Sequence, residues 1–173
     1  MGRPDRRAVL GSALTLAGAL AGCTRFESAS STSTGGNDTT SDTDEGAMSD
    51  LDLREANVTA VEIGERGDGE YRFDVTLYHD DDGEDGYANW WQIERLDGEQ
   101  LGRRDLLHAH STDPFTRSAT IAIPEDVDCV VVRGHDQTHS YGGQAMTVSV
   151  PDGATAAVSQ GSERTAVDAS DCP

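Results

Sequence analysis

The stretch Tyr71-Arg72-Phe73-Asp74-Val75-Thr76-Leu77-Tyr78 places apolar side chains at every second position. Successive side chains of a β-strand point to opposite faces, so this period of two predicts a strand with one buried face. The same alternation from Ser118 to Ile123 and from Met146 to Val150 predicts two more strands. Further candidates with strand composition lie at 57–63, 88–96, 100–108 and 127–133.

Turns rich in Gly, Pro and Asp separate these seven candidates, and no segment carries a capped helical stripe. Seven short strands at this spacing predict an all-β fold, a single antiparallel β-sandwich that resembles immunoglobulin and fibronectin type III domains. Trp90 and Trp91 fall on the third candidate strand, so we expect one in the core and the other partly exposed. We place the sandwich at 51–151 and a polar tail at 152–173.

The first 22 residues have the features of an export leader. An arginine-containing start precedes an apolar run from Ala8 to Ala21, which is too short to span a bilayer permanently. Arg6 and Arg7 resemble the arginine pair of a twin-arginine export signal. Leu20-Ala21-Gly22-Cys23 resembles a lipobox, which implies that residues 1–22 form a signal peptide and that Cys23 carries lipid. The resemblance places the protein outside the cytoplasmic membrane, anchored to its outer face.

Acidic side chains dominate the composition. The 173 residues include 32 acids and 13 bases, for a net charge of −19, and every base other than histidine is arginine. Such an acid excess without lysine resembles proteins of extremely halophilic archaea, in which salt screens the self-repulsion. Nucleic acid is excluded as a partner because phosphate binding needs a basic face. A polybasic attraction to lipid is excluded too, so membrane association is assigned to Cys23.

Residues 23–50 have the composition of a flexible stalk. Twelve Ser or Thr residues lie between 24 and 50, with almost no apolar side chains. Such a segment cannot bury enough surface to offset the entropy of ordering, so we expect a disordered tether. Asn37 and Asn57 each begin an Asn-x-Thr sequon and are candidate glycosylation sites.

Two cysteines remain once Cys23 is assigned to lipid. Cys129 and Cys172 are candidates for a disulfide in an exported protein. The alternative is a buried thiol at Cys129 and an unpaired thiol at Cys172 in a loose tail.

The five histidines carry most of the chemical content of the sequence. His79 follows the second candidate strand, His108 and His110 end the fourth, and His135 and His139 follow the sixth. If every connection reverses the chain, even-numbered strands run the same way and their ends meet at one end of the sandwich. We therefore expect all five imidazoles at that end, as a candidate site for a protein or small ligand.

Metal binding is one alternative for this end of the sandwich. His108-Ala109-His110 has strand spacing, so both rings would point to one face, and His135 or His139 could add a third nitrogen. A site rich in imidazole suits zinc or copper. The competing interpretation is that these histidines hydrogen-bond loop carboxylates and fix the shape of the loops.

Hydrolysis is the third alternative. Asp136, His139 and Ser140 supply the residue types of a catalytic triad, but the sequence has no Gly-x-Ser-x-Gly nucleophile elbow. We therefore predict a non-enzymatic binding protein.

Three loop segments carry a further resemblance. His108–His110, Phe115–Ser118 and His135–Gly143 resemble a family of small exported proteins of unassigned activity, over about residues 70–150. That resemblance brings no catalytic roles to carry over to this chain. Within it, we expect Arg117 to pair with loop carboxylates.

Overall fold

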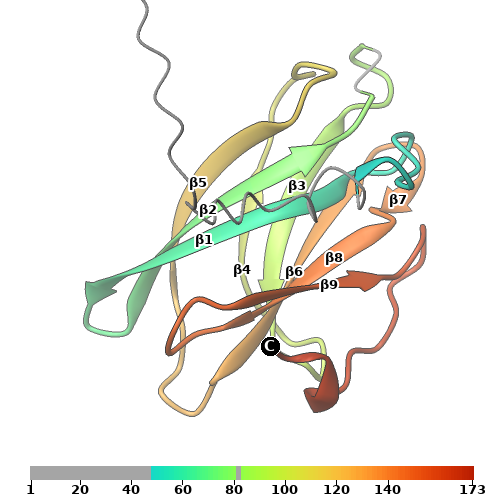
Figure 1. Cartoon of the computed structure of the whole chain (residues 1–173). Coiled ribbons are helices and arrows are strands. Elements are labelled where there is room, and N and C mark those ends of the chain that lie inside the picture. Colours follow the sequence, from blue (N-terminus) through green and yellow to red (C-terminus); the bar gives the residue numbers. More distant parts are fainter. Residues whose placement is uncertain (1–47, 81–82) are drawn as a thin grey trace, which may run out of the picture. The chain divides into compact units, whose positions relative to one another are not determined.

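The computed structural model describes residues 48–80 and 83–173 (Figure 1). The predicted signal peptide at 1–22 with Arg6 and Arg7, the lipid site Cys23, the stalk as far as residue 47, and Asn37 therefore lie outside the described residues. The described part contains nine strands arranged in two antiparallel sheets. From Asn57 onward the one helical segment in the described residues is a short 3-10 helix, and the described part contains no helix long and apolar enough to cross a membrane.

The smaller sheet is built around the stretch that alternates in the sequence. Its three strands lie in the order β1-β2-β5. They are β1 (Asn57–Gly67), β2 (Glu70–Tyr78) and β5 (Phe115–Ala122). As the alternation predicts, Phe73, Val75 and Leu77 are fully buried.

The larger sheet has the order β4-β3-β6-β8-β9, with β7 paired to β6. Its strands are β3 (Ala88–Glu94), β4 (Gln100–Asp105), β6 (Cys129–Asp136), β7 (Ser140–Tyr141), β8 (Gln144–Ser149) and β9 (Thr155–Ser159). In a constant-type immunoglobulin domain the fourth strand joins the first sheet. Here β4 pairs with β3 instead, because the chain reverses through a short turn at Gly98, whose φ of 91° suits glycine.

One apolar core lies between the two sheets. Phe73 and Leu77 of the smaller sheet belong to the same cluster as Trp91, Ile93 and Val132 of the larger one. Trp91 is completely buried and Trp90 is partly exposed, as predicted for neighbouring residues on one strand. Each large side chain of this kind stabilises the fold by about 1.5–3 kcal/mol on burial, so both sheets contribute to the driving force.

All seven predicted strands are present, and the all-β sandwich is confirmed. Two of the differences from the predicted ranges affect the candidate site and the extent of the domain. The predicted strand 100–108 ends at Asp105, so His108 and His110 lie in the connection to β5. The predicted polar tail also contributes to the sandwich, because β9 pairs with β8 beyond residue 151.

The segment after β9 covers the outer face of the larger sheet. Val167 packs against Val131 and Ala145, and the Thr147 hydroxyl donates to the carbonyl oxygen of Asp171 at 2.6 Å. A disulfide joins Cys129 to Cys172 just past the 3-10 helix η1 (Ala169–Asp171). We call residues 160–172 the C-terminal strap; its packing explains why outward-facing residues of β6 and β8 are buried.

A buried ion pair lies beneath this strap. The guanidinium of Arg133 donates from Nε to Glu94 Oε2 at 2.9 Å, and both side chains are almost fully buried. Arg164 of the strap also donates to Glu94, at 3.1 Å, while Arg133 donates to the Thr165 carbonyl at 2.7 Å. Two guanidinium groups therefore neutralise one buried carboxylate, which ties the strap to β3 and β6.

Candidate functional site

The histidines gather at the end of the sandwich where β2, β4 and β6 finish. This end is recognisable from strand pairing, since the last residues of β2, β4 and β6 face the first residues of β1 and β3. The loops after β2 and β4 lie in the upper part of Figure 1. We call this region the histidine end; within it the five imidazoles form three separate groups.

The first group is a buried one around Asp136. His79 is 1% exposed, donates from Nε2 to the Arg54 carbonyl at 3.1 Å, and lies 3.9 Å from Asp136 Oδ2. Asp136 accepts backbone N–H bonds from Thr138 and His139 on its other oxygen, and His139 Nδ1 lies 3.5 Å from that oxygen. These contacts fix the turn after β6, so this group holds the loops in shape.

Carboxylates next to this group have shifted pKa values. The pKa of Glu55 is raised, chiefly by burial and then by the charges of Asp52 and Asp136. The pKa of Asp52 is lowered to about 2, because its carboxylate accepts hydrogen bonds from the side chain and backbone of Arg54. The Asp52 carboxylate is therefore already paired within the protein.

The second group is a cross-strand stack on the outer face of the larger sheet. The Trp90 ring lies 4.2 Å from the His135 ring, nearly parallel to it, and the Arg103 guanidinium lies 3.9 Å from the Trp90 ring centre. Tyr141 meets both rings edge-on at 5.6 Å. His135 donates from Nδ1 to the Asn89 side-chain oxygen at 2.8 Å.

The electrostatics of the stack follow from its burial. The pKa of His135 is lowered, first by desolvation and secondarily by the positive charge of Arg103, which outweigh the opposing effect of Asp136. A neutral imidazole and a cationic guanidinium therefore belong to the same stack, with the indole between them. Contacts of a cation with an indole face stabilise by about 0.5–1 kcal/mol at exposed sites.

The third group lies beyond β4. The rings of His108 and His110 are 4.9 Å apart, and the His110 ring stacks on Phe115 at 4.2 Å. Both histidines line an open pocket of about 480 Å³ between β4 and β5, together with Arg103, Arg104 and Arg117. The other lining residues are Asp105, Leu106, Leu107 and Ala119. We call this cavity the β4–β5 pocket.

The predicted four-histidine metal site is not assembled. No group of three or more His, Cys, Asp or Glu side chains in residues 48–80 and 83–173 has a geometry that could hold a metal ion. His108 and His110 do lie together, but His135 is held in the Trp90 stack and His139 beside Asp136. The rings therefore lie in three places: His79 and His139 beside Asp136, His135 on β6 in the Trp90 stack, and His108 with His110 beyond β4.

Two other residues differ from expectation. Asn57 is fully buried and its side-chain nitrogen donates to the carbonyl oxygens of Asp52 and Glu55, so the folded protein cannot present it for glycosylation. Arg117 makes no ion pair with a carboxylate in the described part of the chain. It donates to the Thr116 carbonyl and lies 5.5 Å from the Phe115 ring instead.

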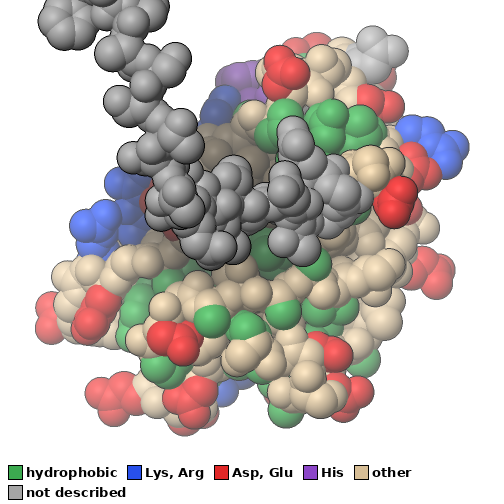
Figure 2. All heavy atoms as spheres, in the orientation of Figure 1, with side chains coloured by type: hydrophobic (Ala, Val, Ile, Leu, Met, Phe, Trp, Pro, Cys, Tyr) green, Lys and Arg blue, Asp and Glu red, His purple; other side chains and the backbone are tan. Residues whose placement is uncertain are grey.

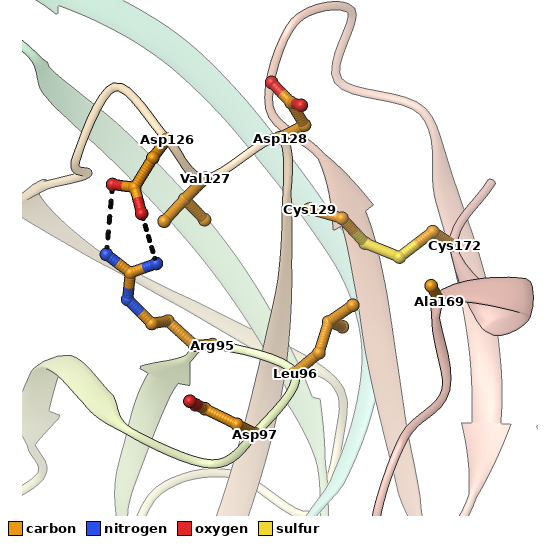
Figure 3. Close-up of a pocket in the computed structure, with 9 residues that line it drawn as sticks. All are labelled: Arg95, Leu96, Asp97, Asp126, Val127, Asp128, Cys129, Ala169 and Cys172. Carbon is orange, nitrogen blue, oxygen red and sulfur yellow. Dashed lines mark hydrogen bonds and ion pairs between the residues drawn. A yellow bond between two sulfur atoms is a disulfide. The ribbon is translucent and has the colours of Figure 1, made fainter.

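A second pocket, of about 470 Å³, lies beside the disulfide (Figure 3). Its arginine, Arg95, donates two hydrogen bonds to Asp126 and also pairs with Glu99. The pKa of Asp126 is lowered by this contact. Because the cation of this pocket is already neutralised, the β4–β5 pocket is the stronger candidate for a ligand.

Sequence reasoning did not single out Arg103 and Arg104 as part of a site. A signal was available, because Arg103-Arg104 is the only adjacent arginine pair beyond the leader. Their convergence with Arg117 depends on β4 and β5 being edge strands of different sheets that meet along one side. That pairing could not be read from the local pattern.

Comparison with known proteins gives one informative relative. Over 130 residues the chain is 65% identical to a protein of the haloarchaeon Halomicrobium mukohataei whose name reads "Putative lipoprotein". The match covers 75% of this chain and 65% of that relative, so the chain spans less than two thirds of the relative's length. No family model matches the chain, and no solved structure matches it.

Proposed function

We propose that this protein is an exported lipoprotein, anchored by lipid on Cys23, whose β-sandwich binds a ligand outside the cell at the histidine end. The lipobox-like Leu20–Cys23 supports the anchor, as does the name of the haloarchaeal relative. The Cys129–Cys172 disulfide fits an oxidising compartment outside the cytoplasm. The acidic surface fits a salt-rich surrounding, which screens its repulsion.

The observation that carries the binding role is the open β4–β5 pocket beside the Trp90 stack. Ligand sites combine a concave surface, aromatic or apolar contact area and a few convergent polar groups, and this pocket has all three. The buried His79 group, in contrast, has its loop-shaping contacts already made. The ligand site is therefore assigned to the exposed part of the histidine end.

The geometry around Asp136 supports binding over hydrolysis. In a triad the carboxylate orients the histidine, and the histidine activates a nucleophile from a separate segment. Here Asp136 is occupied by two backbone N–H groups, and no hydrogen bond joins the side chains of His139 and Ser140 in the described residues. We therefore propose a non-enzymatic role.

The same reasoning favours an organic ligand over a metal. His108 and His110 offer two imidazoles, one or two fewer than the protein ligands of most zinc sites. Isothermal titration of the mature protein with zinc and with copper(II) tests this point. We expect no site with a Kd below roughly 10 μM; a tighter site that His108→Ala abolishes would reinstate metal capture.

The anchor is tested by Cys23→Ser in the native host. The wild-type protein should fractionate with membranes and be degraded by protease added to intact cells, while the variant should be found in the medium or unprocessed. Ser28→Ala in the stalk is the control and should leave the distribution unchanged. A Cys23→Ser variant that stays in the membrane fraction in processed form would contradict the proposal.

A further inference from the structure

The arginines of the sandwich divide into paired and unpaired ones. Residues 48–80 and 83–173 contain nine arginines. Five form ion pairs with carboxylates: Arg54, Arg72, Arg95, Arg133 and Arg164. Within this described part the other four, Arg66, Arg103, Arg104 and Arg117, have no such partner. In a chain with 32 acids a carboxylate partner is easily supplied, so arginines without one need an explanation.

Three of these four arginines line one cavity. Arg104 comes from β4, opposite Trp91 of β3, and Arg117 comes from β5, opposite Val75 of β2. Both therefore lie at the seam where the edge strands of the two sheets meet, around the β4–β5 pocket. In Figure 2 histidine (purple) and a basic side chain (blue) are visible near the upper edge, with carboxylates (red) both there and over the rest of that face.

The donors of these guanidinium groups are only partly used. Arg103 donates to the neutral amide oxygen of Gln92, at 2.6 and 3.2 Å, and Arg117 donates to a backbone carbonyl. Asp105 lines the same pocket but forms no ion pair with any of them within the described residues. Each guanidinium has five N–H donors, so most of the donor capacity around the pocket stays available.

We propose that the β4–β5 pocket binds a small organic anion, whose carboxylate or phosphate group lies between Arg104 and Arg117. A guanidinium matches the two oxygens of such a group with paired, charge-assisted hydrogen bonds. Arg103 adds positive charge at the rim. Leu107, which is 81% exposed, and Ala119 give the organic part of the ligand an apolar contact.

The concave shape selects a soluble ligand rather than a membrane surface. A cavity of about 480 Å³ is within the range of small-molecule sites and can surround a ligand on several sides. A flat anionic bilayer would also be repelled by a molecule with net charge −19. The inference rests on the proposed binding role of the histidine end, but it does not depend on the lipid at Cys23.

Isothermal titration of the mature protein with citrate and with inorganic phosphate tests the proposal, with chloride at equal ionic strength as the reference. We expect saturable binding at one site. The double variant Arg104→Gln/Arg117→Gln should weaken it at least tenfold. Arg66→Gln removes an unpaired arginine from β1 near its far end and should leave the affinity unchanged.

Circular dichroism establishes that each variant is folded. If the glutamine variant does not fold, Arg104→Lys/Arg117→Lys decides, because it keeps the charge but loses the paired geometry; it should bind several-fold more weakly.

The proposal is overturned if neither citrate nor phosphate binds more tightly than chloride, if the pocket variants bind like the wild type, or if Arg66→Gln weakens binding equally. Binding to anionic vesicles without binding of either soluble anion also overturns it. If one of these results is obtained while membrane anchoring still depends on Cys23, the anion site is refuted and the lipid anchor is not. If anchoring does not depend on Cys23, the proposed lipoprotein function fails whatever the anion titrations show.

Discussion

Reduction of the Cys129–Cys172 disulfide should destabilise the sandwich substantially. The bond closes a sequence separation of 43 residues, from the start of β6 to the end of the strap. The loop-entropy relation for this separation gives about 4 kcal/mol of stabilisation, through restriction of the unfolded chain. For a domain of this size the loss corresponds to a fall in Tm of roughly 10–20 °C.

The assay is urea unfolding of the mature protein at constant high salt, with and without reductant. Both cysteines are partly exposed, so the reductant reaches the bond. Cys129→Ser/Cys172→Ser is the matched control: it should lose the same free energy of unfolding and respond no further to reductant. A loss below about 1 kcal/mol would contradict this expectation, because it would mean that the strap contacts alone, without closure of the chain, hold β6 and the C-terminus together.

Three further predictions follow from buried or stacked residues. Arg133→Met leaves the buried Glu94 carboxylate with Arg164 and the neutral Gln92 amide beside it, and should cost about 3–5 kcal/mol in the same urea assay; a loss under about 1 kcal/mol would contradict the ion-pair account. In an NMR titration the pKa of His135 should lie below 6.5, and Trp90→Ala should raise that pKa towards 6.5; a midpoint at or above 6.5 in the wild type would contradict the burial of the ring. Because the pKa is lower in the folded than in the unfolded state, the stability that this group contributes is complete above pH 6.5 and declines as the pH falls towards the folded-state pKa. The peptide that contains Asn57 should have its unmodified mass in protein from the native host, and a glycan on it would contradict the buried amide.

Much of the fold could be predicted because its core strands follow simple alternation. Phe73, Val75 and Leu77 are large, regularly spaced and bounded by turns, so both the strand and its buried face could be read from the sequence. The strand β9 could not, because Thr155–Ser159 contains only small side chains and Val158. It forms by pairing with the edge of β8, an interaction between segments that local composition does not encode.

The sequence predicted at which end of the sandwich the histidines lie, but not which groups their rings contact. Chain reversal at each turn places the ends of β2, β4 and β6 at one end of the sandwich, which is where the imidazoles lie. Which ring meets which depends on strand register and on loop shape. His135 faces outward to Trp90 because of the β3–β6 register, while His139 turns back to Asp136.

The unpaired arginines were hidden for the same reason. From the sequence, Arg117 was expected to pair with loop carboxylates such as Asp113, four positions earlier. In the fold it meets Phe115 and lines a pocket with Arg104, which is 13 positions earlier and belongs to the other sheet. The acidic composition therefore predicted a surface rich in carboxylates, but not a pocket lined by arginines that form no ion pair in the described residues.

The lipid anchor is tested by the mass of the N-terminal peptide of the protein, isolated from membranes of its native host. We expect a mature chain that begins at Cys23 and carries a lipid mass on that residue. A chain that retains residues 1–22, or one that carries an unmodified thiol at position 23, would contradict it.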